Sequence, residues 1–351
     1  MNIQLTNWFK AAAMITALTT TGCTTISTEN TQMRPDATQP PIIIAHRGAS
    51  GYLPEHTLEA AILAFSQGAD FIEQDLVLSK DGELIVLHDI HLERTTDVEQ
   101  KFPLRARDDG RFYAIDFTLA ELKTLIVHER HTAAGQAVFK DRYTGNAPFR
   151  LATFEEQIVL INQLNQLHDK NVGLYPEIKA PAWHINEGQD ISQVTLAMLR
   201  KHQLDSANAA VYLQCFDFNE LKRIKKELNA NVKLVQLLAE NSWNESTNDY
   251  NYLRSSAGLT EIAEIAAGVG PWLGHLVDPA NGQITPLVSN AKQLGLKVHP
   301  YTFRADQLPP GLSAQQTSTL LFEVLAVEGI FSDHTDVSKK LLSELKLNTT
   351  Q

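Results

Sequence analysis

The sequence predicts an α/β protein, a (β/α)8 TIM barrel with an insertion after its second strand. From residue 42 onward, short apolar segments alternate with amphipathic helical stretches, as expected of strand–helix units around a parallel sheet. Eight such segments occur, at residues 42–46, 69–76, 173–178, 210–215, 232–237, 265–269, 297–302 and 329–332. A chain of 351 residues accommodates either two modest domains or one large barrel with an insertion, and the eight repeats favour the barrel.

The first units of the barrel are marked by a helix cap and a hairpin. Thr57 stands where a helix would begin after the first segment. The apolar run 84–87 follows the second segment after only the short polar stretch 79–83. A parallel crossover needs roughly a dozen residues, so this run must return antiparallel. Residues 89–150 then form an insertion over the barrel mouth, which we expect to close with a helix capped by Thr118 and Glu121.

Later helices carry the same kind of start signal. Thr153 with Glu156, and Asp217 with Glu220, precede apolar residues at helical spacing. We expect the barrel and its insertion to span residues 41–340 and residues 341–351 to form a C-terminal tail.

The segment before the barrel predicts export. Lys10, an apolar run at residues 11–18 and small residues before Cys23 have the three-part pattern of an export signal at residues 1–23. The stretch before Cys23 resembles a bacterial lipoprotein cleavage site, so we expect lipidation of Cys23. The residue after Cys23 is Thr24 rather than an Asp, which favours a periplasmic protein anchored to the outer membrane. The alternative is ordinary secretory cleavage nearby, without lipidation. Residues 24–40 are rich in Thr, Ser, Asn, Gln and Pro and predict a flexible tether.

The composition argues against some classes of binding partner and against global disorder. The formal net charge of -11 argues against a protein whose affinity depends on neutralising nucleic-acid phosphates. Hydrophobic and charged residues make up 43% and 20%, close to globular averages, which excludes global disorder. Of the two cysteines, Cys215 lies in an apolar segment and is expected to be buried. The oligomeric state is not predicted.

Polar residues gather where the predicted strands end, and catalytic groups of such barrels lie at these ends. The first segment ends in His46 and Arg47, and the hairpin returns to His88. Alternation along a strand places Glu73 and Asp75 on one face of the second segment. It does the same for Glu177 and Lys179, which lie on the third segment and just beyond it.

These residue types suit phosphate chemistry with a bound cation. The carboxylates Glu73, Asp75 and Glu177 repel one another unless a metal or other cations stabilise them. Oxygen ligands favour Ca²⁺, with Mg²⁺ as the alternative, whereas Zn²⁺ would recruit His or Cys. The histidines His46 and His88 could serve as zinc ligands, but cationic neighbours favour general acid–base work beside a phosphate.

Several segments together resemble the glycerophosphodiester phosphodiesterase family, in its bacterial periplasmic and lipoprotein form. They are His46-Arg-Gly-Ala-Ser-Gly-Tyr-Leu-Pro-Glu-His-Thr57, Glu73-Gln-Asp75, His88-Asp89, Tyr175-Pro-Glu-Ile-Lys179, His299-Pro-Tyr-Thr302 and the insertion phrase at residues 109–117. The resemblance runs in order from about residue 42 to residue 333. It implies a calcium-dependent barrel enzyme that hydrolyses small-molecule glycerophosphodiesters, such as glycerophosphocholine and glycerophosphoethanolamine, to glycerol 3-phosphate and an alcohol.

The resemblance also assigns roles. It implies catalysis by His46 and His88, phosphate contacts by Arg47 and Lys179, and a supporting role beside the phosphate for Glu55. The implied metal ligands are Glu73, Asp75 and Glu177.

Two other functions stay open at this point. One is a phospholipase-type phosphodiesterase that acts on lipid headgroups; the other is a surface binding lipoprotein that kept the barrel without its chemistry. We expect the leaving group to face the insertion, near Phe112, Tyr113 or Trp183, where an aromatic face could favour choline.

Overall fold

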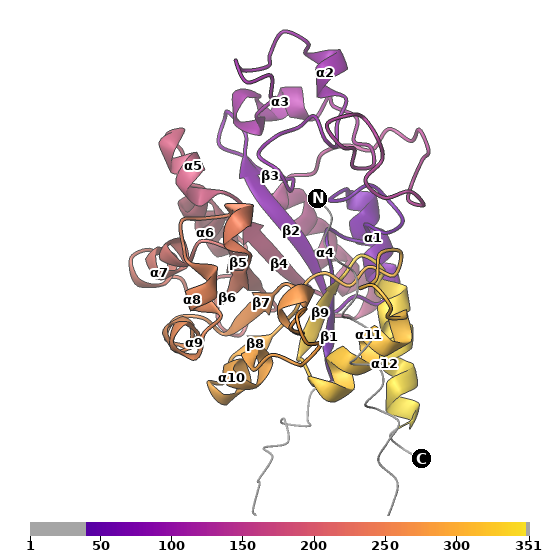
Figure 1. Ribbon diagram of the computed structural model, residues 1–351. Helices are drawn as coiled ribbons and strands as arrows, with labels where there is room; N and C mark the ends of the chain where they lie inside the picture. Colours follow the sequence, from indigo (N-terminus) through magenta and orange to yellow (C-terminus); the bar gives the residue numbers. More distant parts are fainter. Residues whose placement is uncertain (1–39, 349–351) are drawn as a thin grey trace, which may run out of the picture.

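The structure, a computed structural model, describes residues 40–348 and contains a nearly closed barrel of parallel strands surrounded by helices (Figure 1). The order around the sheet is β8-β7-β6-β5-β4-β2-β1-β9, and each neighbouring pair is parallel. These strands are β1 (Ile42–Ala45), β2 (Phe71–Leu78), β4 (Gly173–Ile178), β5 (Tyr212–Cys215), β6 (Lys233–Leu238), β7 (Gly268–Pro271), β8 (Lys297–Val298) and β9 (Gly329–Ser332). Beyond β8, Phe303 donates its backbone N–H to the carbonyl oxygen of Phe331 in β9 at 2.8 Å. This hydrogen bond joins the chain after β8 to β9 and so brings the two ends of the sheet together. The predicted fold is confirmed, and each of the eight predicted segments overlaps an observed strand. The largest differences lie in two bounds, because β7 begins at Gly268 rather than residue 265 and β8 ends at Val298 rather than residue 302.

The hairpin is also confirmed. Strand β3 (Leu84–Val86) pairs antiparallel with the end of β2, with Leu76 opposite Val86. Because β3 runs back along β2, the chain leaves the barrel here and enters the insertion.

The insertion between β3 and α4 packs around a small core of its own, beside β2 and β3 in Figure 1. It contains α2 (Val98–Lys101), η3 (Ala114–Asp116) and α3 (Leu119–Leu122). Phe117 and Leu125 are fully buried in this core. The predicted cap is present, since Thr118 and Glu121 form a reciprocal capping box on α3. The expectation that this helix closes the insertion is wrong: α3 is a single turn, and an irregular stretch rich in polar residues follows it up to α4.

Helices cover the outside of the barrel. They are α1 (Leu58–Ser66), α4 (Phe154–His168), α5 (Pro181–Asn186), α6 (Ile191–Lys201), α7 (Phe218–Lys226), η4 (Asn241–Trp243), α8 (Tyr250–Leu253), α9 (Ser256–Ala263), η5 (Leu273–His275), α10 (Leu287–Gln293), α11 (Ala314–Thr319), η6 (Leu320–Val324) and α12 (Thr335–Asn348). The predicted caps Thr57, Thr153 and Asp217 each accept a backbone N–H in the first turn of their helix. The main hydrophobic core lies between these helices and the sheet, and Ile44, Tyr175, Val235 and Phe331 form a second cluster.

The C-terminal boundary needs correction. The predicted tail at residues 341–351 is helical as far as Asn348, because α12 continues with Leu341, Leu342 and Leu345 buried. Cys215 is buried as predicted. Within residues 40–348, no helix is long and apolar enough to cross a membrane. The export signal, Cys23 and most of the tether lie outside the described residues, so those statements stay predictions.

Candidate active site

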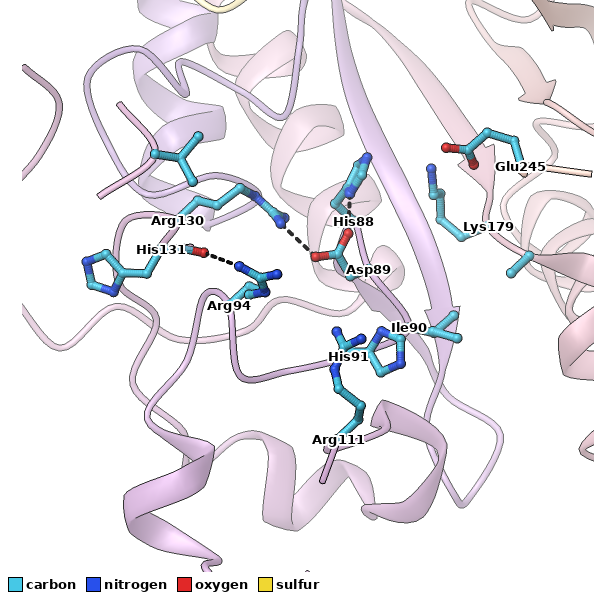
Figure 2. Close-up of a pocket in the computed structure, with 12 residues that line it drawn as sticks. His88, Asp89, Ile90, His91, Arg94, Arg111, Arg130, His131, Lys179 and Glu245 are labelled. Atoms are coloured by element: carbon cyan, nitrogen blue, oxygen red, sulfur yellow. Dashed lines mark hydrogen bonds and ion pairs between the residues drawn. The ribbon is translucent and has the colours of Figure 1, made fainter. Parts of the chain in front are cut away.

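The site residues meet where β1, β2 and β4 end, beside the chain that leaves β3. A pocket of about 460 Å³ opens there between the barrel and the insertion (Figure 2). His88, Asp89 and Lys179 line its barrel side, while Arg94 and Arg130 come from the insertion. The insertion therefore forms one wall of the pocket.

The turn after β1 aims two site residues at the barrel mouth. Arg47 and Gly48 both have a positive φ, 60° and 78°. A Cβ on Gly48 would lie 2.8 Å from the backbone carbonyl carbon of Ala60 in α1, so only glycine fits against that helix. In this conformation the backbone N–H of Arg47 donates to Glu73 Oε2 at 2.7 Å. The turn thereby joins the β1 end to the carboxylates of β2.

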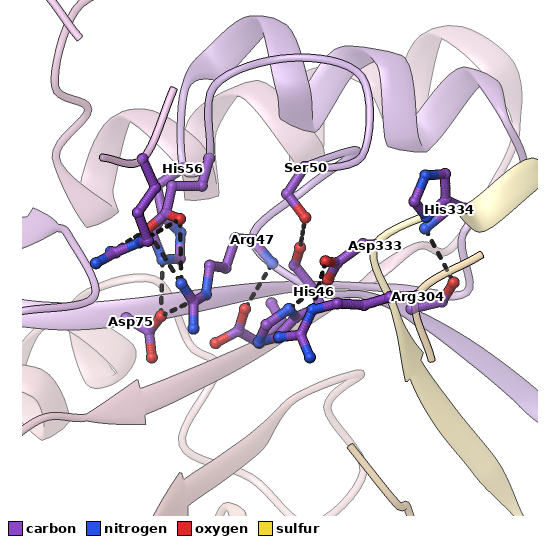
Figure 3. Close-up of polar contacts among 12 residues, drawn as sticks. His46, Arg47, Ser50, His56, Asp75, Arg304, Asp333 and His334 are labelled. Atoms are coloured by element: carbon purple, nitrogen blue, oxygen red, sulfur yellow. Dashed lines mark hydrogen bonds and ion pairs between the residues drawn. The ribbon is translucent and has the colours of Figure 1, made fainter. Parts of the chain in front are cut away.

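His46 is held by a carboxylate from the far end of the chain (Figure 3). Its Nδ1 lies 2.7 Å from Asp333 Oδ1, and the other oxygen of Asp333 accepts from Arg142 at 2.6 Å and from Arg304 at 2.9 Å. Burial, with the nearby charge of Arg47, lowers the pKa of His46 to about 4. A carboxylate in this setting only accepts hydrogen bonds, so Nδ1–H donates and Nε2 keeps its lone pair for the substrate.

His88 has a matching arrangement. Its Nδ1 lies 2.6 Å from Asp89 Oδ1, and Asp89 Oδ2 accepts from Arg130 at 2.6 Å. Burial and the charges of Arg47 and Lys179 lower the pKa of His88 to about 4. Each predicted catalytic histidine thus presents a neutral imidazole whose ring is oriented by an aspartate, and each aspartate is itself bound by arginine.

The three predicted metal-binding carboxylates lie on neighbouring strands. Asp75 is directly opposite Glu177 in the register of β2 and β4, and Glu73 is two residues earlier on β2. All three side chains are buried. Burial and the charge of Asp75 raise the pKa of Glu73 well above its usual range, and burial raises that of Glu177 to about 8. Although burial opposes it, the nearby His88, the charge of Lys179 and a hydrogen bond with His56 hold the pKa of Asp75 well below its usual range.

Cations lie against these carboxylates. Lys179 Nζ is 2.7 Å from Glu177 Oε1 and 3.9 Å from Asp75 Oδ1. Arg47 Nε is 3.4 Å from Asp75 Oδ2 but makes no hydrogen bond, although the atom is buried. Glu55 bridges Arg47, at 3.1 Å, and Arg130, at 2.6 Å. Glu55 is therefore placed to orient the two guanidinium groups.

His56 is a further residue of the site, to which the sequence patterns assigned no role. The side chain is buried, and its Nε2 lies 2.8 Å from Asp75 Oδ2 (Figure 3). His56, Glu73 and Asp75 offer ligand atoms within 4.8 Å of one another, so this group could hold a metal ion. The signal was its place in the segment that carries Glu55 and Thr57. The positive φ of His56, 66°, which turns the chain back toward β2, could not be read from spacing.

The donor set fits a divalent cation. Burial and the charge of Asp75 favour the neutral form of Glu73. A bound cation would offset this repulsion and favour the ionised carboxylate. Carboxylate oxygens from Glu73, Asp75 and Glu177 suit a hard ion, and His56 adds a nitrogen that touches Asp75.

The expected aromatic contact for the leaving group looks different in the structure. Phe112 is buried in the core of the insertion. Tyr113 stacks on Trp183 with ring centroids 5.4 Å apart, and the guanidinium of Arg107 lies 4.2 Å from the Tyr113 ring. The cation position over this pair is thus already filled by the protein.

Comparisons with known proteins agree with this geometry. Residues 46–337 match the model of the glycerophosphoryl diester phosphodiesterase family. The chain is 42% identical to a glycerophosphodiester phosphodiesterase of Haemophilus influenzae, over 96% of this chain and 98% of that protein. It is 39% identical to a glycerophosphodiester phosphodiesterase of Treponema pallidum, over 86% of this chain and 92% of that protein.

Solved structures share the fold. A phosphodiesterase of Oleispira antarctica, in complex with the product sn-glycerol-3-phosphate, matches with a TM-score of 0.60 at 21% identity, covering 87% of this chain and 97% of that one. A glycerophosphodiester phosphodiesterase of Thermotoga maritima matches with a TM-score of 0.56 at 18% identity, covering 86% and 99%.

Proposed function

The chain belongs to the glycerophosphoryl diester phosphodiesterase family and is a glycerophosphodiester phosphodiesterase, and from this premise we propose that it hydrolyses glycerophosphodiesters to glycerol 3-phosphate and an alcohol with the help of Ca²⁺. The substrates include glycerophosphocholine, glycerophosphoethanolamine and similar diesters. The observation that carries the proposal is the pair of aspartate-oriented histidines, His46 and His88, at strand ends that also carry buried carboxylates and cations.

The two histidines act as acid and base. One imidazole Nε2 takes the proton from the glycerol hydroxyl next to the ester, and the hydroxyl oxygen forms a bond to phosphorus as the bond to the alcohol breaks. The other histidine, as imidazolium, gives its proton to the departing alcohol. His88 lines the pocket that opens toward the insertion, so we assign it to the leaving group. The negative phosphate bound beside it raises its proton affinity. This step leaves a cyclic phosphate on the glycerol. Water then attacks its phosphorus and opens the ring, with the histidine that acted as acid now acting as base and the other as acid.

The remaining side chains bind and orient the phosphate. Arg47 offers its guanidinium group, and Lys179 its ammonium, to the phosphoryl oxygens. A divalent cation held by Glu73, Asp75 and Glu177, with His56 against Asp75, would supply further positive charge at a phosphoryl oxygen. We propose Ca²⁺ because the three carboxylates are hard oxygen ligands, with Mg²⁺ as the alternative.

A substrate lacking the neighbouring hydroxyl tests the route. We expect its turnover to fall at least about a hundredfold, because the internal nucleophile is missing. Single variants His46→Ala and His88→Ala should lose activity on both kinds of substrate. Unchanged turnover of the substrate without the hydroxyl would mean that water attacks phosphorus directly.

We also propose that residues 1–23 direct export and that Cys23 is lipidated, which would place the enzyme in the periplasm at the outer membrane. The sequence pattern before Cys23 supports this. Mass spectrometry of the mature N-terminus should find acylated Cys23, and Cys23→Ser should release the enzyme from the membrane fraction. An unmodified N-terminus at another residue would contradict the proposal.

A further inference from the structure

The pocket extends beyond the catalytic residues onto the insertion. From His88 it continues along the side chains of Arg94, Arg130 and His131 on one side, with Arg111 and His91 near its outer part (Figure 2). Lys179 and Glu245 lie across the pocket from Arg94 (Figure 2). The carboxylates expected to hold the metal are not among the lining residues. The outer pocket therefore faces the part of the substrate beyond phosphorus, the leaving group.

Most positive charges in this wall are already neutralised. Arg130 is paired with Glu55 and Asp89, and Arg111 is paired with Glu93. Lys179 is paired with Glu177 on the barrel side.

Arg94 differs from the other cations of the pocket. Its NH1 donates to the backbone carbonyl of His131 at 3.1 Å, which fixes the side chain against the insertion. Among residues 40–348 no acidic side chain forms an ion pair with it, and it remains partly exposed to the pocket. A guanidinium held in a cavity without a carboxylate partner keeps its charge and donors available for an anionic ligand.

The aromatic residues expected to contact a cationic leaving group are not among the residues that line this pocket. The aromatic pair Tyr113 and Trp183 lies under the guanidinium of Arg107, at 4.2 Å and 5.8 Å from the two rings. A quaternary ammonium group would have to displace Arg107 from the rings and would meet the charge of Arg94 in the pocket.

We propose that this outer pocket, with Arg94 as the main contact, is a subsite for a leaving group that carries negative charge, such as an alcohol bearing a second phosphate. This inference rests on the proposed function and adds to it the class of the preferred substrate.

The test compares three substrates with the same glycerol 3-phosphoryl part. They are glycerophosphocholine, glycerophosphoglycerol and bis(glycerophospho)glycerol, whose leaving groups are cationic, neutral and anionic. For the full chain with Ca²⁺, we expect kcat/KM for the anionic diester to exceed that for the choline diester by about tenfold. Arg94→Gln should abolish this preference by lowering kcat/KM for the anionic diester about tenfold more than for the choline diester. The preference of wild type should also shrink with added salt.

A matched variant controls for charge alone. Lys226→Gln removes one positive charge at the exposed end of α7, outside the pocket, and should leave the preference unchanged. An equal loss for all three substrates in Arg94→Gln would mean that Arg94 holds the reacting phosphate, and no loss would mean that it holds nothing; either result overturns the inference.

Equilibrium binding separates this inference from the proposed function. His46→Ala protein, titrated with the same three diesters, should bind the anionic one most tightly and lose that preference when Arg94→Gln is added. If wild type hydrolyses none of the diesters, the proposed function fails, while the binding preference and its loss still decide the subsite. Equal affinity for all three diesters would overturn it.

Discussion

At the residue scale, each catalytic histidine depends on a carboxylate that fixes its ring. The sequence predicted His46 and His88 because both lie at strand ends, and predicted Glu73 and Asp75 because alternation puts them on one face. It could not predict that Asp333 would accept hydrogen bonds from Arg142 and Arg304 as well as from His46. Those contacts join residues up to 287 positions apart and depend on the path of an irregular insertion.

The role of Asp333 can be tested by removing its charge. Asp333→Asn keeps the size of the side chain but offers His46 an amide, which neither fixes the tautomer nor stabilises the imidazolium. We expect kcat to fall by about 10²–10⁴, as for other histidines that lose an orienting aspartate. Steady-state kinetics over a range of pH should show the loss at every pH, with unchanged KM.

Asp306 provides the control. It binds Arg142 Nε at 2.9 Å but makes no contact with His46. Asp306→Asn should therefore keep kcat within about threefold. Equal losses in the two variants would mean that both act through Arg142 and that Asp333 does not orient the histidine.

At the scale of elements, the predicted strands and caps follow from local patterns, whereas the interior of the insertion does not. The start of the insertion could be predicted, because the link before residues 84–87 is too short for a parallel crossover. The arginines that it sends to the site, Arg94, Arg130 and Arg142, have no local signal, because they occupy irregular chain. Their positions depend on how the insertion core, around Phe117 and Leu125, packs beside β2 and β3.

Gly48, in the turn between β1 and α1, and Gly68, just after α1, allow a matched pair of substitutions. Gly48 and Gly68 both have positive φ, 78° and 87°, so Ala at either position costs about 1 kcal/mol of backbone strain. Only at Gly48 would the new Cβ meet a backbone atom, the Ala60 carbonyl carbon at 2.8 Å, while nothing lies within 4 Å at Gly68.

We therefore expect Gly48→Ala to lose at least about 1 kcal/mol more unfolding free energy than Gly68→Ala. It should also lose more than about tenfold in kcat/KM, because the clash moves the turn that carries His46 and Arg47. Urea unfolding and kinetics on both variants measure the difference. Similar losses in the two would show that the contact with α1 does not position the turn.

At the scale of the whole molecule, buried neutral histidines tie stability to pH. Burial is the largest cause that lowers the pKa of each of them: to about 4 for His184 and His275 and to about 3 for His299, in addition to the two catalytic histidines. In the unfolded chain histidine binds its proton near pH 6.5. Between about pH 6.5 and pH 4 these histidines therefore hold more protons in the unfolded chain and contribute less stability as the pH falls. Glu177 contributes in the opposite sense, because its raised pKa of about 8 keeps it protonated in the folded state.

We expect the unfolding free energy in chelator to drop, between about pH 7.5 and about pH 5, by about 2 kcal/mol more in the wild type than in His184→Gln, because this variant lacks one group that binds its proton only after unfolding. Urea unfolding at a series of pH values gives this drop, and its slope gives the number of protons taken up on unfolding. An equal drop in the two proteins would show that His184 is protonated in the folded protein.

The central claim is that the two oriented histidines hydrolyse a glycerophosphodiester only when the neighbouring carboxylates hold a metal ion. The most direct measurement follows glycerol 3-phosphate release from glycerophosphoglycerol by the full chain, first stripped with chelator and then titrated with Ca²⁺, with His46→Ala beside it. The account predicts no release without metal, activity that rises with the amount of Ca²⁺ bound, and none at any Ca²⁺ concentration in His46→Ala. Full activity of the stripped protein, or of the His46→Ala variant, would contradict it.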